Sequence, residues 1–206
     1  MKVLLINGSP REKGCTYTAL TLVAKTLEEN GVETEIFWAG AQPIGGCTGC
    51  GGCRKTEACV YGGPVNALLE KAKEADGFVF GSPVHYAGIS GNAKGLLDRA
   101  FYAGKAYFAH KPAALVVSAR RAGTTAALDE MMKYPTINQM PVVSSCYWSM
   151  VHGSVPEDVL QDAEGCAVME QLGCNMAWLL RCIQLGAENG IPHPDTPARP
   201  MTNFIR

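Results

Sequence analysis

Short apolar runs alternate along the chain with segments in which apolar residues recur at helical spacing. Apolar or alternating runs predict five strands, at residues 2–7, 32–38, 77–84, 111–119 and 139–145. Helical spacing predicts five helices, at residues 16–31, 64–75, 88–104, 124–134 and about 156–188. A glycine- and cysteine-rich loop separates the second strand from the second helix. Strands and helices therefore alternate over most of the chain.

This alternation predicts an α/β fold with a parallel sheet between two layers of helices. Five strands favour the doubly wound, flavodoxin-like order 2-1-3-4-5. Residues 1–190 are expected to form one domain that carries the Cys-rich loop at 45–62, with a proline-rich tail at 191–206 that wraps its own surface or a partner. Ligands of such sheets bind beyond the carboxyl ends of the strands, which directs attention to loops 8–16, 82–90 and 118–125.

Composition narrows the classes of function. The 206 residues carry a net charge of −1, which gives no basic surface for a nucleic acid or an anionic membrane. No apolar run reaches the roughly 18 residues of a membrane span. The first strand begins at Lys2, which leaves no room for a signal peptide, so we expect a cytoplasmic protein.

The first loop suits a phosphate group. It connects a strand to a helix, and a helix N-terminus presents unpaired N–H groups and a partial positive charge. Ser9, Thr16 and Thr18 add hydroxyls, Arg11 adds a guanidinium fork, and Gly14 permits close approach of the backbone. The alternative is an ordinary capped turn. No acidic residue ends the second strand and the glycine triplet is absent, so a mononucleotide fits better than a dinucleotide.

The second and third loops offer groups suited to a flat ring. Residues 81–94 supply backbone amides, small residues, His85 and Tyr86. Residues 118–125 supply Ser118, Gly123 and two arginines. The arginines would place positive charge beside the ring; the alternative is that they are solvated surface charges.

Four stretches together resemble the flavodoxin-fold NADPH-dependent FMN reductase family, and most closely its branch related to iron–sulfur flavoproteins. They are GSPREKGCTYTAL, GSPVHYAGISGNAKGLLDR, SARRAGTTAALDEM and MPVVSSCYWSMVHG. The resemblance implies FMN, with its phosphate at the first loop and its isoalloxazine ring between the second and third. The residues carried over for the phosphate are Ser9, Arg11, Thr16, Tyr17 and Thr18. Those that would line the ring are Pro83, Val84, His85, Tyr86 and Gly88. Those that would close the other side are Ser118, Arg120, Arg121, Gly123 and Thr124.

The chain departs from the family pattern at Cys15, where relatives often carry Ser or Asn. A thiol donates weakly, so one phosphate contact is expected either to be lost or to be supplied by backbone. Tyr147, Trp148 and His152 are expected either to cover the flavin or to form a hydrophobic corner of the core.

Cys47, Cys50, Cys53 and Cys59 follow a C-x2-C-x2-C-x5-C spacing. Four thiolates can hold a [4Fe–4S] cluster or a zinc ion. The spacing matches the motif of the iron–sulfur flavoproteins that the chain resembles. It differs from the bacterial ferredoxin run, so a flavin-only protein with an apolar turn here is the alternative. Three further cysteines on the last helix, Cys166, Cys174 and Cys182, face different directions and are expected to fill the core.

The last helix is apolar over most of its circumference, which suits burial or a subunit interface. The resemblance implies a homodimer or homotetramer. Two functions stay open. One is an enzyme whose FMN takes hydride from NAD(P)H and passes electrons to flavin, quinone or another small acceptor. The other is an electron carrier, with or without a cluster, that accepts electrons from a ferredoxin-like protein. Because FMN carries the chemistry, no residue is named as catalytic.

Overall fold

The computed structural model describes residues 1–197 and Thr202. The strands are β1 (Lys2–Asn7), β2 (Glu33–Trp38), β3 (Gly77–His85), β4 (Gly88–Ile89), β5 (Ala113–Ala119) and β6 (Met150–His152). The helices are α1 (Cys15–Glu29), α2 (Cys53–Thr56), α3 (Pro64–Glu74), α4 (Gly91–Gly104), α5 (Thr124–Ile137), α6 (Pro156–Val159) and α7 (Ala163–Glu188), with a 3-10 turn η1 (Lys105–Tyr107).

The main sheet runs β2-β1-β3-β5-β6, and all of its neighbouring pairs are parallel. Counting only these five strands gives the order 2-1-3-4-5, which confirms the predicted flavodoxin-like fold. The short β4 lies outside this path and folds back antiparallel on the end of β3. It occupies the start of the segment predicted as the third helix, so α4 begins later, at Gly91, with Ser90 as its N-cap.

The prediction of a fifth strand at 139–145 was wrong. Val142 makes only an isolated bridge to Ala113, and the strand that joins the sheet is β6, eight residues further on. Pro141 lacks the N–H that would continue a ladder. The Ser145 hydroxyl then donates to the Val168 carbonyl of α7, 2.6 Å away, which draws the chain from the sheet.

The last helix is also not continuous from 156. The single turn α6 ends at Val159, and α7 begins at Ala163 behind Asp162, whose carboxylate accepts the Gly165 N–H at 3.0 Å. This side-chain cap marks a new helix start rather than a continuation.

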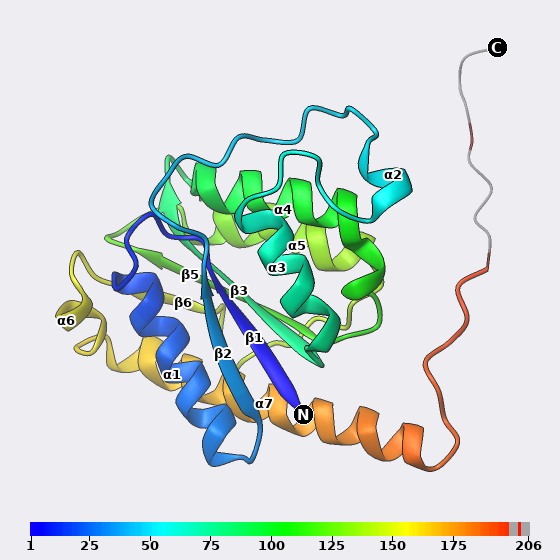
Figure 1. The fold of residues 1–206 in the computed structure, drawn as a ribbon. Coiled ribbons are helices and arrows are strands. Elements are labelled where there is room, and N and C mark those ends of the chain that lie inside the picture. Colours follow the sequence, from blue (N-terminus) through cyan, green and yellow to red (C-terminus); the bar gives the residue numbers. More distant parts are fainter. Residues whose placement is uncertain (198–201, 203–206) are drawn as a thin grey trace.

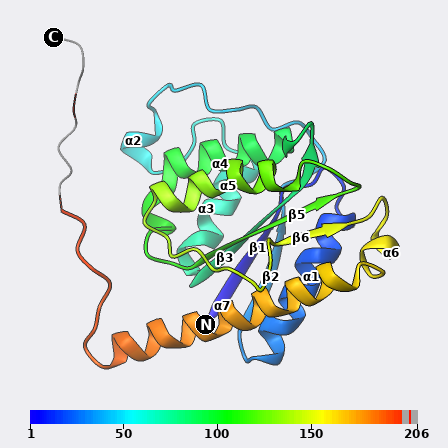
Figure 2. The same ribbon diagram turned by 180° about the vertical axis from the view of Figure 1, so that it is seen from behind.

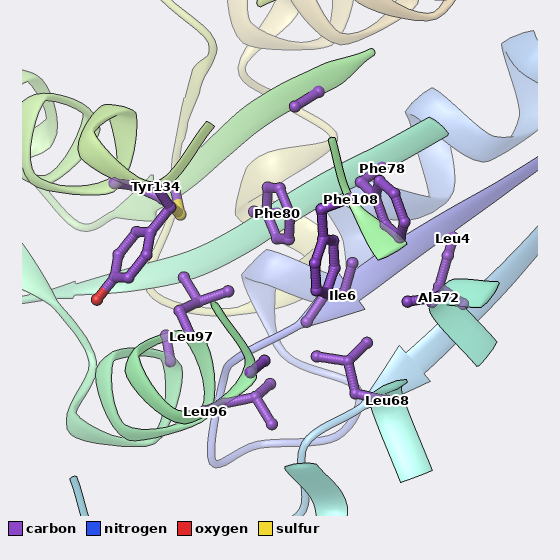
Figure 3. Packing of buried hydrophobic residues seen from close by; sticks show 14 of the residues in the cluster. Leu4, Ile6, Leu68, Ala72, Phe78, Phe80, Leu96, Leu97, Phe108 and Tyr134 are labelled. Carbon is purple, nitrogen blue, oxygen red and sulfur yellow. The ribbon is translucent and has the colours of Figure 1, made fainter. Parts of the chain in front are cut away.

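Helices α3, α4 and α5 cover one face of the sheet, while α1 and α7 cover the other (Figure 1, Figure 2). The first face carries an aromatic cluster in which Phe108 lies 4.8 Å from Phe78 and 4.7 Å from Phe101 between ring centroids. Figure 3 shows Phe78, Phe80 and Phe108 packed above Leu68 and Leu96. Two apolar layers therefore hold the sheet rigid beneath the loops at its carboxyl edge.

Helix α7 buries only part of its surface. Met169, Leu172 and Met176 are buried against the sheet and α1, whereas Trp178 and Leu185 are exposed. The expectation that the cysteines of this helix fill the core was wrong for Cys174 and Cys182, which are exposed, and Cys166 is half-buried. No helix in the described residues is both long and apolar enough to cross a membrane.

The described part of the tail contacts the chain's own surface. The His193 ring stacks on His110, with centroids 4.5 Å apart, and the Thr196 hydroxyl donates to the Gln139 side chain. The rest of the predicted tail, apart from Thr202, lies outside the described residues.

Candidate functional site

The first loop leaves β1 in a fixed conformation because buried Asn7 organises it. The Asn7 carboxamide accepts the Ser9 N–H at 3.1 Å and donates to the Glu12 carbonyl at 2.8 Å. The Ser9 hydroxyl accepts the Arg11 N–H at 3.1 Å. The Trp38 indole N–H, from the end of β2, donates to the Ser9 carbonyl at 2.9 Å. The loop is therefore held by its own polar groups and by the neighbouring strand.

Helix α1 starts at the end of this loop without a side-chain cap. Its N-cap is Gly14, and its first turn holds no acidic residue. The N–H groups of the first turn have no partners within the helix and carry the positive end of its dipole. Thr18 and Tyr17 are half-buried beside this turn, while Arg11 is exposed. An anion placed here meets donors on several sides.

Cys15 does not face this anion position. Its thiol points to the Gly153 carbonyl, with sulfur and oxygen 3.5 Å apart, on the loop that follows β6. Burial raises the pKa of this thiol. Cys15 therefore links the first loop to the end of the sheet, and the backbone of α1 supplies the donors next to it.

The second loop is bound closely to the first. The Ser90 hydroxyl donates to the Gly8 carbonyl at 2.6 Å, and the Ser90 N–H donates to the Ser82 hydroxyl at 2.9 Å. A Cβ added at Gly8 would lie 2.6 Å from the Ala93 Cβ, so only glycine lets the first loop approach α4 this closely. Sequence reasoning missed Asn7, Ser82 and Ser90, whose polar character inside an apolar stretch was the available signal.

The second loop is a tight hairpin between β3 and β4. Its two central residues, Tyr86 and Ala87, have φ values of 49° and 60°. Pro83, Val84 and Gly88 are half-buried around it, whereas His85 and Tyr86 are exposed.

The third loop contacts both others. The Thr16 and Ser118 hydroxyls are buried and 2.8 Å apart. Gly123, with φ +93°, packs against Ala87 so closely that a Cβ would lie 2.7 Å from the Ala87 Cα. Thr124 is buried at the start of α5, and Arg120 and Arg121 are exposed. The structure thus brings all three predicted loops together at the carboxyl edge of the sheet.

The segment between α5 and β6 contributes exposed aromatic side chains. The Tyr147 and Trp148 rings lie edge to face, with centroids 5.0 Å apart, and both are exposed. Together with His152 they line a cavity of about 60 Å³. The His152 Nδ1 lies 3.6 Å from the Asp162 carboxylate. These side chains are not part of the hydrophobic core.

The four cysteines of the 47–59 loop are not gathered into one centre. Cys47 and Cys50 are exposed; the Cys53 thiol lies 3.6 Å from the Tyr102 carbonyl, and the Cys59 sulfur accepts the Arg99 Nε–H at 3.2 Å. Within the part of the chain that the structure describes, no three His, Cys, Asp or Glu side chains lie close enough to hold a metal ion. The donor set has the chemistry of a cluster site, but the geometry does not converge on one.

The three-loop site fits a flavin mononucleotide. A helix N-terminus without a side-chain cap and with hydroxyls beside it suits a phosphate, and a hairpin that extends past the last β3–β5 pair suits the edge of a planar ring.

Comparisons with known proteins agree with this fit. The sequence profile of the NADPH-dependent FMN reductase family matches residues 1–154. An iron–sulfur flavoprotein of Methanocaldococcus jannaschii is 29% identical over 192 residues, which cover 89% of this chain and 100% of that protein. An iron–sulfur flavoprotein of Archaeoglobus fulgidus is 31% identical over 169 residues, which cover 80% of this chain and 83% of that protein.

Solved structures share the fold. RosB with a bound 8-demethyl-8-formylriboflavin-5'-phosphate superposes with a TM-score of 0.69 at 16% identity, over 100% of this chain and 92% of that one. A WrbA-like flavodoxin of Agrobacterium tumefaciens gives 0.63 at 14% identity, over 88% and 98%. The fold, the three joined loops and the profile match lead to one conclusion: the chain belongs to the NADPH-dependent FMN reductase family, and with it to the FMN-dependent oxidoreductases.

Proposed function

We propose that the chain binds FMN across its three joined loops and transfers electrons from NAD(P)H to a small acceptor such as a flavin or a quinone. The observation that carries the proposal is the junction of the loops. The Thr16–Ser118, Ser90–Gly8 and Gly123–Ala87 contacts join a phosphate position to a ring position. When bound, the flavin supplies the hydride and electron chemistry.

The phosphate is assigned to the start of α1. The candidate donors there are the first-turn N–H groups, the Ser9 hydroxyl and the Arg11 guanidinium. The Thr18 hydroxyl donates to the Gly14 carbonyl, 3.4 Å away, and would turn from it to reach a phosphate. In the Thr16–Ser118 pair one hydroxyl donates to the other, so one hydroxyl hydrogen remains to donate to an anion. Tyr17 borders the same turn.

The ring is assigned to the second and third loops. Residues 83–88 present backbone amides and carbonyls to its polar edge, while Gly123 and Thr124 close the opposite side. The exposed Arg120 and Arg121 would add positive charge beside it. The nicotinamide is expected to stack on the outer face of the flavin, where Tyr147 and Trp148 offer exposed aromatic surface.

Two measurements test the proposal. Adding NADPH to the flavin-loaded protein without oxygen should bleach the flavin absorbance, and a colourless protein that takes up no FMN would refute the assignment. Arg11→Ala should weaken FMN binding about tenfold while leaving riboflavin binding unchanged, because riboflavin lacks the phosphate. Lys13→Ala removes a positive charge from the same loop and should leave both affinities unchanged.

An electron carrier is the second candidate. Its support is the name iron–sulfur flavoprotein borne by the relatives, together with the four cysteines at 47–59. Anaerobic purification followed by iron, sulfide and zinc analysis separates a cluster from zinc and from a flavin-only protein. Reduction by a ferredoxin with negligible NADPH oxidation would favour the carrier over the enzyme.

We further propose a cytoplasmic homodimer or homotetramer built from one domain of residues 1–190. The exposed Trp178 and Leu185 on α7 support an assembly because they form an apolar surface that the described part of the chain does not cover. Light scattering during size-exclusion chromatography would measure the mass, and a monomer at micromolar concentration would refute the assembly.

A further inference from the structure

A carboxylate of α5 binds the backbone of the β3–β4 hairpin. The Glu130 Oε2 accepts the Ile89 backbone N–H at 2.9 Å. The same oxygen would lie 2.8 Å from a Cβ added at Gly88, so the carboxylate fills the space beneath the hairpin that the glycine leaves open. Glu130 is partly buried and lies outside every group of residues assigned to the flavin above.

The hairpin needs such support because its turn is strained. A two-residue turn with positive φ at both positions is usually built from Asn or Gly, whereas this one uses Tyr86 and Ala87. A non-glycine residue in the left-handed region persists where surrounding contacts hold it there. The Tyr86 side chain is fully exposed and contributes no packing that would hold the turn. The strand pairing of Val84 with Ile89 holds the base of the hairpin, and Gly123 and Glu130 contact it from the third loop and from α5.

Glu130 is itself held between two helices. Its Oε1 lies 3.7 Å from the Lys94 ammonium of α4. Lys94 also donates to the Tyr134 hydroxyl at 3.1 Å and lies 3.5 Å from Asp98, to which Tyr134 donates. The carboxylate that contacts Ile89 is therefore fixed by a polar network joining α4 to α5.

We propose that Glu130 is a positioning residue that fixes the β3–β4 hairpin in the shape that receives the flavin ring. The inference rests on the proposed function, because the ring is assigned to residues 83–88 there. The phosphate position has its own supports in Asn7 and the start of α1, and Glu130 touches neither. Removing Glu130 should therefore weaken the ring part of the binding and leave the phosphate part intact.

Paired titrations with FMN and riboflavin test this separation, read by quenching of flavin fluorescence. Glu130→Ala should weaken the binding of both ligands by the same factor of about ten, which corresponds to about 1.4 kcal/mol. Glu130→Gln should stay within about threefold of the wild type, because its amide oxygen can still accept the Ile89 N–H. Asp129→Ala, on the exposed side of the same helix, is the matched control and should change neither affinity.

Hydrogen exchange of the ligand-free protein gives a second readout. Glu130→Ala should speed amide exchange in residues 86–90 and leave residues 8–14 unchanged. If that variant does not fold, Gly88→Ala replaces it, since the added Cβ would displace the carboxylate and should produce the same faster exchange.

The outcomes separate the two claims. Wild-type protein that binds neither ligand would refute the proposed function, and this inference with it. Wild-type binding with unchanged affinities and exchange in Glu130→Ala would refute the inference alone. A loss confined to FMN, or an equal loss in Glu130→Gln, would also overturn it, because the hydrogen bond to Ile89 would then not be the cause.

Discussion

Substitution of Gly123 by alanine tests whether the third loop and the hairpin depend on close backbone contact. Gly123 has φ +93°, and an added Cβ would lie 2.7 Å from the Ala87 Cα and 3.0 Å from the Val84 Cγ1. A left-handed alanine costs about 1–2 kcal/mol, and displacing packed atoms costs about 1–3 kcal/mol more. We therefore expect Gly123→Ala to lower the free energy of unfolding by about 2–5 kcal/mol.

Two other glycines isolate the two contributions. Gly31 has φ +76° with nothing within 4 Å of the added Cβ, so Gly31→Ala should show only the conformational cost of about 1–2 kcal/mol. Gly91, at the start of α4, has neither a positive φ nor a neighbour within 4 Å. Gly91→Ala should therefore leave stability unchanged or raise it by about 0.4–1 kcal/mol.

Equilibrium unfolding in urea, followed by circular dichroism, measures the three variants on one scale. FMN affinity is a second measurement. Gly123→Ala should bind FMN more weakly than the wild type, and Gly31→Ala should bind it equally well. A Gly123→Ala variant no less stable than Gly31→Ala would show that the contact with Ala87 is not tight, and the account of the joined loops would fail.

Three further predictions concern the body of the fold. Phe108→Ala should lower the free energy of unfolding by about 3–5 kcal/mol, because the ring is fully buried among aromatic neighbours; Tyr102→Ala, at an exposed ring on α4, should change it far less. Hydrogen bonding to Lys71 holds the pKa of Glu35 below its usual range, so the stability that Glu35 contributes is present above about pH 5 and is lost as the pH falls. The free energy of unfolding of Glu35→Gln should therefore fall less steeply between about pH 5 and pH 3 than that of the wild type. Burial raises the pKa of Tyr134 far above its ordinary value. A spectrophotometric titration should therefore find at most six of the seven tyrosines ionised before the protein unfolds at alkaline pH. Tyr134→Phe should show the same number of ionised tyrosines as the wild type over that pH range.

The parallel strands of the centre were predictable because they are continuous apolar runs buried on both faces, as β1, β3 and β5 are. The strand at the edge was not. β6 has only three residues, of which Val151 alone is buried, whereas the more apolar stretch around Val142 and Val143 makes a single bridge. A period of two cannot be read from three residues, so hydrophobicity favoured the wrong segment.

The location of the candidate site followed from topology, but its internal contacts did not. The carboxyl ends of parallel strands meet at one edge, which brings loops 8–16, 82–90 and 118–125 together in any sheet of this order. The Thr16–Ser118 hydrogen bond joins residues 102 positions apart. Such pairings depend on side-chain direction within each loop, and no local pattern carries that information. The same limit applies to Cys15, which faces Gly153 instead of the anion position.

Helix α4 connects the candidate FMN site to the Cys-rich loop. At its start, Ser90 binds the Gly8 carbonyl of the first loop. Two residues later, the Asn92 side chain accepts the Ile44 N–H at 3.2 Å, in the segment that follows β2. Gly95 lets that segment cross α4 closely, since a Cβ there would meet the Ile44 carbonyl.

Further along the same helix, Arg99 contacts the Cys59 sulfur and the Gly62 carbonyl. Arg99 is buried, and its guanidinium also lies over the Tyr61 ring, 5.8 Å from the ring centroid, so its described partners come from the 59–62 part of the loop. Figure 1 shows the loop lying along α4. Nine residues of helix separate Ser90 from Arg99, about 14 Å along the axis. Helix α4 therefore contacts the first loop through Ser90 and the Cys-rich loop through Arg99, so one continuous helix spans the distance between the two regions.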